Sequence, residues 1–185
     1  MEQAVKPTTP LEACMVQPTD IHEHLQTLHM LSVELDLKTV LELGTRGGES
    51  TIALLEAAKK KGGIVYSIDI DPCLEAKAKI HAYRLDKYWV FIQGDDLKVE
   101  WNRAIDHLFI DTMHTYISTI KELEKFEPYV KNGGIIVLHD IVSHPEVLLA
   151  INDYARNRKD LRIYKYFNCQ GLAIIFKGHM AIRHV

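Results

Sequence analysis

The feature that most constrains the fold of this chain is an alternation of short apolar runs with longer segments of helical periodicity. The runs are four to six residues long and cover residues 40–43, 64–68, 89–93, 105–110 and 135–138. Consecutive parallel strands need crossover connections, which are right-handed and usually helical. The alternation therefore predicts an α/β protein whose parallel sheet carries helices on both faces.

The other segments complete this architecture. Apolar residues at helical spacing predict helices over 20–36, 50–62, 73–85, 116–131 and 145–158. Two β-rich segments near the end, 162–167 and 172–176, are separated by a hairpin-length turn and should pair antiparallel at one edge of the sheet. We thus expect a mostly parallel, seven-stranded sheet with an antiparallel C-terminal strand.

The first residues of the chain lack this periodicity. Three prolines and the absence of a helical or strand pattern predict an irregular N-terminal arm over 1–19, with Asp20 as the N-cap of the helix that follows. Residues 20–185 are then expected to form a single domain, as the length of the chain also favours.

Charge and cysteine content narrow the classes of function. The chain has 22 Lys and Arg against 25 Asp and Glu, a net charge of −3, which is too weak and of the wrong sign for binding nucleic acid through its phosphates. The three cysteines have no close partner in sequence, which favours a reducing compartment. No apolar run approaches the roughly 20 residues of a membrane helix. We expect a cytoplasmic protein with a small-molecule substrate and with neither nucleic acid nor a membrane as partner. Whether the chain forms a homo-oligomer is left open.

A glycine-rich turn follows the first predicted strand. Gly44, Gly47 and Gly48 fall within five residues; Gly44 and Gly48 allow a tight turn close to a ligand, and the next helix offers free N–H donors. Arg46 stands where a dinucleotide fingerprint needs glycine, and no Gly-Lys-Ser/Thr of a phosphate loop follows. Because ligands of open α/β sheets bind at this end of the strands, the turn predicts a ligand site.

Acidic residues end the next two predicted strands. Asp69 lies 25 residues after Gly44, and a carboxylate at a similar distance binds the ribose diol in dinucleotide sites. Asp95 and Asp96 follow Gly94 at the end of the third strand. Asp71 and Asp96 are the alternatives to Asp69 and Asp95 as the binding acids, or else caps of the following helices.

Together these motifs resemble those of class I S-adenosylmethionine-dependent methyltransferases. The resemblance is strongest to the small O-methyltransferases related to catechol O-methyltransferase and to the cephalosporin-hydroxylase-like enzymes. It extends over 20–177 and rests on the segments 41–51, 67–72, 94–95, 109–111 and 132–137. It implies a Rossmann-like three-layer sandwich that binds S-adenosylmethionine: Gly44, Thr45 and Ser50 at the methionine portion, Asp69 at the ribose hydroxyls and Asp95 at the adenine amine.

Four polar side chains follow the fourth and fifth strands: Asp111, His114, His139 and Asp140. The carboxyl ends of parallel strands share one edge of the sheet, so these groups can converge beside the cofactor. Methyl transfer to oxygen needs a deprotonated acceptor, and a divalent cation lowers the pKa of the acceptor and orients it. Two nearby carboxylates also repel each other unless a cation lies between them.

The resemblance implies specific roles for these residues. Asp111 and Asp140 correspond to metal ligands, and His114 takes the place of a catalytic lysine, where a histidine can act as a base near neutral pH. Ile141 replaces the family's third ligand, an asparagine, so the site would recruit His139 or water. We expect Mg²⁺ or Ca²⁺, with Mn²⁺, Zn²⁺ or Fe²⁺ favoured if His139 is a ligand.

The leading interpretation is a metal-assisted O-methyltransferase acting on a small hydroxylated molecule. Two alternatives stay open: a metal-independent methyltransferase with His114 or His139 as the base, and a domain that binds the cofactor or a nucleotide without turnover. A nicotinamide-dependent oxidoreductase is disfavoured because Arg46 interrupts its glycine fingerprint.

Overall fold

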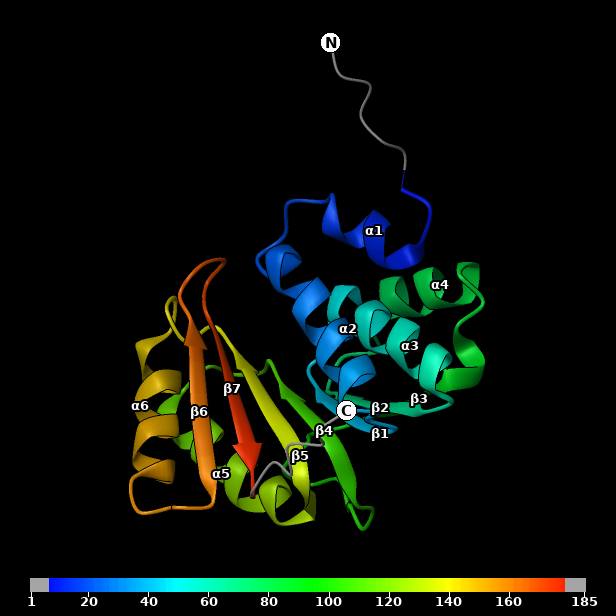
Figure 1. Cartoon of the computed structure of the whole chain (residues 1–185). Helices are drawn as coiled ribbons and strands as arrows, with labels where there is room; N and C mark the ends of the chain where they lie inside the picture. Colours follow the sequence, from blue (N-terminus) through cyan, green and yellow to red (C-terminus); the bar gives the residue numbers. More distant parts are fainter. Residues whose placement is uncertain (1–6, 179–185) are drawn as a thin grey trace, which may run out of the picture.

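The computed structural model describes residues 7–178 and is built around an open, twisted sheet (Figure 1). Within these residues the sheet has seven strands in the order β3-β2-β1-β4-β5-β7-β6. The strands are β1 (Thr39–Leu43), β2 (Ile64–Asp69), β3 (Trp89–Gln93), β4 (Ile105–Ile110), β5 (Val130–His139), β6 (Leu161–Tyr166) and β7 (Leu172–Lys177). The pairs from β3 to β5 are parallel, and β7 is antiparallel to both β5 and β6. The predicted mostly parallel sheet with an antiparallel C-terminal strand is confirmed.

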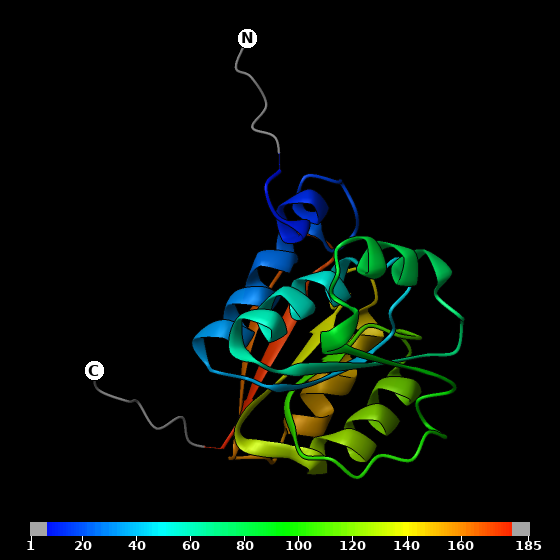
Figure 2. The ribbon, with the colours of Figure 1, turned by 90° about the vertical axis from the view of Figure 1, so that its right-hand side faces the viewer.

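Helices cover both faces of the sheet and make a three-layer structure (Figure 2). One face carries α1 (Pro10–Met15), α2 (Leu25–Glu34), α3 (Glu49–Lys61) and α4 (Leu74–Ala82), and the other carries α5 (Tyr116–Phe126) and α6 (Pro145–Ala155). Short 3-10 helices are η1 (His22–His24), η2 (Asp86–Tyr88) and η3 (Glu127–Tyr129).

Each central strand contributes side chains to both cores. In β5, Ile135 and Val137 pack in the core beneath α1–α4, whereas Ile136 and Leu138 pack in the core beneath α5 and α6. Successive side chains of a strand point to opposite faces, so a strand covered on both faces favours apolar residues at most of its positions. This is why the strands were recognisable in the sequence as continuous apolar runs.

The strand order changes direction between β1 and β4, and this is where the loops are brought together. The backbone amide of Asp111, after β4, donates to the carbonyl of Leu43 at the end of β1 (2.9 Å). Gly44 has φ +87, and a Cβ on it would lie 2.0 Å from the carbonyl oxygen of Asp111. Only glycine permits this approach, so Gly44 lets the loops after β1 and β4 meet at the switch point, where α/β proteins bind ligands.

The N-terminal part differs from the prediction. The expected irregular arm over 1–19 is wrong for Pro10–Met15, which form α1, with Leu11 and Cys14 buried against the core. Thr9 and Glu12 form a capping box and Pro10 occupies the first turn, a start signal that the sequence contains. Residues 1–6 of the predicted arm and 179–185 of the predicted domain lie outside the described residues.

Helix boundaries also differ: the helix predicted over 73–85 ends at Ala82 and the one predicted over 145–158 ends at Ala155, and two other helices differ more. The predicted helix over 20–36 is divided into η1 and α2, and Asp20 is not its N-cap because its carboxylate pairs with Arg46 instead. The predicted helix over 116–131 ends at Phe126, and β5 already begins at Val130, with a register irregularity against β4. Among the helices of residues 7–178, none is both long and apolar enough to cross a bilayer.

Candidate active site

A cavity of about 550 Å³ lies at the carboxyl ends of β1 to β4. Gly44, Asp69 and Asp95, three of the predicted cofactor residues, line it. A smaller cavity of about 110 Å³ is lined by Thr45 and Ser50, two more of that set. The two cavities share four lining residues: Gly44, Arg46, Asp111 and Thr112. The structure therefore brings five of the predicted cofactor residues to two adjoining cavities.

Asp69 is held by the backbone of the surrounding loops. One carboxylate oxygen accepts from the amides of Thr45 (2.7 Å) and Arg46 (3.1 Å), and the other accepts from the amide of Asp71 (2.9 Å). Burial raises the pKa of Asp69, but these hydrogen bonds outweigh it and hold the pKa below its usual value. Asp69 is therefore an oriented carboxylate in the cavity wall, with capacity left for a further donor.

Asp95 and Asp96 have different surroundings. Asp95 pairs with Lys98 (2.8 Å), which keeps the pKa of Asp95 below its usual value. Asp96 is partly buried, and within residues 7–178 one of its oxygens has no hydrogen-bond partner. Its neighbour in the cavity wall is Glu122 of α5, whose pKa burial raises to about 7. The sequence analysis missed Glu122 because it stands in a charged stretch that is typical of a solvated helix face.

Ser50 has a structural partner that was not anticipated. Glu42 of β1 is buried and accepts hydrogen bonds from the hydroxyls of Ser50 (2.8 Å), Thr51 (2.7 Å) and Ser67 (2.6 Å). Burial nevertheless raises the pKa of Glu42 to about 7. Because the Ser50 hydroxyl proton is directed at Glu42, Ser50 offers the smaller cavity only an acceptor oxygen.

Gly48 does not line either cavity. It has φ +87, and a Cβ on it would lie 2.8 Å from the Cβ of Ala76 in α4. Gly48 therefore allows α3 to begin in close contact with α4. The structure assigns it a packing role, in place of the direct contact with cofactor that the sequence suggested.

Asp111, His114, His139 and Asp140 converge, as predicted. His114 Nε2 lies between the two carboxylates, 3.0 Å from Asp111 Oδ1 and 2.9 Å from Asp140 Oδ2. His139 Nδ1 lies 3.7 and 3.4 Å from the same two oxygens. His114 and Asp140 both adopt positive φ (54° and 62°), a conformation that costs a non-glycine residue about 1–2 kcal/mol and that is concentrated at functional sites.

The charges of this cluster are mutually compensated. Hydrogen bonds to Asp111 and Asp140 raise the pKa of His114 to about 9, against the effect of burial. Burial raises the pKa of Asp111, but the two imidazoles lower it to about 2, and they also keep the pKa of Asp140 far below its usual value. In this arrangement the two carboxylates favour the protonated form of His114 near neutral pH, and its role as a base stays a prediction.

The same residues fit a divalent cation. The His139 side chain is fully buried, and among residues 7–178 its Nδ1 has no hydrogen-bond partner within normal distance. One ligand atom each from Asp111, His139 and Asp140 lie within 4.8 Å of one another. Ile141, which replaces the expected asparagine, is buried in the apolar core. The donor set is thus two carboxylates and one unpartnered imidazole nitrogen, which is suitable for a metal.

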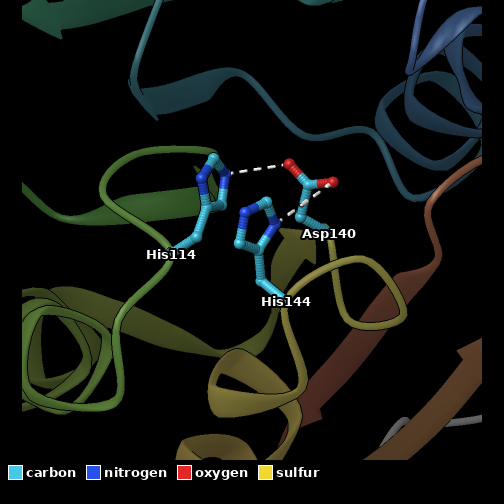
Figure 3. Close-up of side chains that lie close together, drawn as sticks. All are labelled: His114, Asp140 and His144. Atoms are coloured by element: carbon cyan, nitrogen blue, oxygen red, sulfur yellow. Dashed lines mark ion pairs between the residues drawn. The ribbon is translucent and has the colours of Figure 1, made fainter.

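The sequence analysis also missed His144, which precedes α6. Its ring is stacked on that of His114, with centroids 4.5 Å apart (Figure 3). Asp140 thus has a histidine near each of its carboxylate oxygens. The only signal in the sequence was the spacing of four residues between Asp140 and His144, which is common without any functional meaning.

Comparison with known proteins identifies the family to which the chain belongs. Residues 41–141, more than half of the chain, match the family described as the methyltransferase domain. An O-methyltransferase of Bacillus cereus in complex with S-adenosylhomocysteine has a similar structure, with a TM-score of 0.74 and 15% identity over 94% of this chain and 93% of that one.

Two further solved structures are similar. The O-methyltransferase TomG of Streptomyces achromogenes, involved in tomaymycin synthesis and in complex with S-adenosylmethionine, has a TM-score of 0.71 and 15% identity over 95% of this chain and 92% of that one. A methyltransferase of Geobacter sulfurreducens has a TM-score of 0.73 and 16% identity over 95% and 91% of the two chains. At these identities the likeness shows a common fold.

Proposed function

Because this chain belongs to the methyltransferase-domain family, we propose that it transfers a methyl group from S-adenosylmethionine to an oxygen of a small hydroxylated molecule, with a divalent cation beside the acceptor. The observation that carries this proposal is the position of Asp111. Asp111 lines both cavities at the switch point, and its carboxylate belongs to the cluster of two acids and two imidazoles. Cofactor cavity and acid–base cluster therefore share one wall.

The larger cavity suits the adenosine portion of the cofactor. Asp69 would accept hydrogen bonds from the ribose hydroxyls, and Asp95 from the adenine amine. The smaller cavity, with the acceptor oxygen of Ser50, suits the ammonium group of the methionine portion. Asp69, Asp95 and Asp111 make the walls acidic, which favours a ligand that carries a positively charged sulfonium. The similar structures from Bacillus cereus and Streptomyces achromogenes, which hold the demethylated product and the cofactor, support this assignment.

The cluster provides the acceptor side. Asp111, Asp140 and His139 would hold the cation, which when bound lowers the pKa of an acceptor hydroxyl and fixes its orientation. His114 lies at hydrogen-bond distance from both carboxylates. With a cation on the carboxylates, the imidazole of His114 would lose its extra proton to solvent, and the neutral ring would then accept the proton that the acceptor hydroxyl releases.

The proposal is tested with S-adenosylmethionine labelled in its methyl group and a panel of catechols, phenols and hydroxy acids. We expect methyl transfer in the presence of Mg²⁺ or Mn²⁺ and its loss in excess chelator. Asp140→Ala should abolish transfer and leave the affinity for S-adenosylhomocysteine unchanged, since Asp140 lines neither cavity. Asp86→Ala, at an exposed aspartate of η2, is the matched control and should change neither quantity.

A metal-independent reaction is the second candidate, and one observation favours it. Two imidazoles already balance the two carboxylates of the cluster, so the acids need no cation to lie close together. A base with a raised pKa becomes active only as the pH rises. Transfer that survives chelator should therefore increase up to about pH 9, the pKa of His114. Tight cofactor binding with no transfer to any member of the panel would instead favour a binding domain without turnover.

A further inference from the structure

His144 lies at the solvent-facing side of the cluster and has no part in the proposed transfer. Its side chain is about half-exposed (49%) and its ring is stacked on that of His114 with an interplanar angle of 20°. Figure 3 shows that both rings direct a nitrogen toward the carboxylate of Asp140. A surface histidine that only covers a neighbour would not need this orientation.

The distances describe a three-residue group. His114 Nε2 is 2.9 Å from Asp140 Oδ2, and His144 Nδ1 is 3.8 Å from Asp140 Oδ1. The second distance is too long for a hydrogen bond; His144 Nδ1 contacts Ser143 Oγ (3.2 Å), which itself donates to Asp140. One ligand atom from each of His114, Asp140 and His144 lie within 4.8 Å of one another.

This group differs chemically from the one formed by Asp111, His139 and Asp140. It has two imidazoles and one carboxylate, and nitrogen ligands of this kind select Zn²⁺ and neighbouring transition metals, whereas carboxylate and carbonyl oxygens suit Mg²⁺ and Ca²⁺. Three protein ligands leave a coordination position for water, and the exposure of His144 provides access from solvent.

We propose that His114, Asp140 and His144 form a second metal site, which takes a borderline transition-metal ion such as Zn²⁺, and that its occupation inhibits methyl transfer. Binding of the ion releases the proton of His114 to solvent, because an imidazole must be neutral to bind a metal. Inhibition follows because an ion here withdraws Asp140 and His114 from the acceptor. That part of the inference rests on the proposed function, whereas binding of the metal does not.

Binding is measured by titrating the whole protein with Zn²⁺ in a calorimeter, without cofactor or acceptor. Co²⁺ replaces Zn²⁺ in a parallel titration, because its visible absorption reports nitrogen coordination. His144→Ala should weaken Zn²⁺ binding by at least the roughly 10- to 100-fold that the loss of an outer-shell partner already costs. His81→Ala, at a histidine on α4 that is largely exposed, should retain the wild-type affinity. Asp111→Ala removes only a hydrogen-bond partner of His114 and should lose less affinity than His144→Ala.

An unchanged Zn²⁺ affinity in His144→Ala, or a larger loss in Asp111→Ala than in His144→Ala, places the ion elsewhere and overturns the proposal. In a methyl-transfer assay with Mg²⁺, His144→Ala should require more Zn²⁺ for inhibition, by the factor seen in its binding. Equal inhibition of variant and wild type would contradict the inhibitory role. Absence of transfer in every protein, with Zn²⁺ binding still dependent on His144, would count against the proposed function alone.

Discussion

Asp69 shows how a single carboxylate can both shape a loop and present itself to a ligand. Three backbone amides, from Thr45, Arg46 and Asp71, donate to it before any ligand binds. Its orientation in the cavity is therefore set in advance, which reduces the ordering needed on binding. Asp71, the alternative acid, is exposed and donates its own backbone amide to Asp69, so it acts as a support of the residue that we assign to the ribose.

We expect Asp69→Ala to weaken binding of S-adenosylhomocysteine by about 10- to 150-fold, since hydrogen bonds to a charged group contribute about 1.5–3 kcal/mol. Asp71→Ala is the control, and its effect should be much smaller. Calorimetric titration of the two variants distinguishes them, with urea unfolding as a check that the loop remains intact. A larger loss in Asp71→Ala than in Asp69→Ala would transfer the role to Asp71.

At the scale of secondary-structure elements, the turn between β1 and α3 matters through its two positive-φ glycines. Gly44 lets the loops after β1 and β4 touch, and Gly48 lets α3 begin against Ala76 of α4. The two glycines therefore allow close approach between neighbouring elements, and neither glycine needs to contact a ligand to do so. This explains why a glycine-rich turn indicates a site even where the individual glycines do not bind.

Gly48→Ala should destabilise the protein by more than Gly62→Ala. Both positions have positive φ (87° and 69°), which costs alanine about 1–2 kcal/mol. A Cβ at Gly62 meets nothing within 4 Å among the described residues, whereas one at Gly48 lies 2.8 Å from the Cβ of Ala76, and overpacking adds about 1–3 kcal/mol. Urea unfolding measures both variants, and equal losses would mean that α4 yields freely to α3.

For the molecule as a whole, the N-terminal residues are part of the packed structure. α1 lies against α3, and Leu11 and Cys14 belong to the core beneath α1–α4. Farther along, Asp20 pairs with Arg46 of the glycine turn (2.6 Å), and Ile21 lines the smaller cavity. The segment before α2 therefore covers part of the core and also forms one side of the candidate site.

Leu11→Ala should lower the free energy of unfolding by about 2–5 kcal/mol, as is usual when a buried leucine leaves a cavity. Val16→Ala, one residue after α1 and 64% exposed, should change it by less than about 0.5 kcal/mol. Thermal or urea unfolding of the full chain provides the comparison. A negligible effect of Leu11→Ala would mean that the packing of α1 contributes little to the free energy of unfolding.

The sequence by itself determined the sheet and its mostly parallel order, and it predicted the edge of the sheet at which the candidate site lies. The apolar run over 135–138 in β5 is visible because burial on both faces favours apolar side chains at successive positions, and this demand is local. The convergence of Asp111 and Asp140 was likewise predictable, because topology brings the carboxyl ends of neighbouring parallel strands to one edge. The capping box at Thr9 was also present in the sequence, although the prolines around it favoured an irregular arm.

Only the tertiary structure decided which partner each polar side chain has. Ser50 donates to Glu42, Asp20 pairs with Arg46, and His114 lies between two carboxylates that raise its pKa to about 9. His144 entered the cluster through its stacking on His114, across a sequence separation of 30 residues. Burial and charge act through distance in space, so the pKa values of these groups follow from the packing of the loops around them.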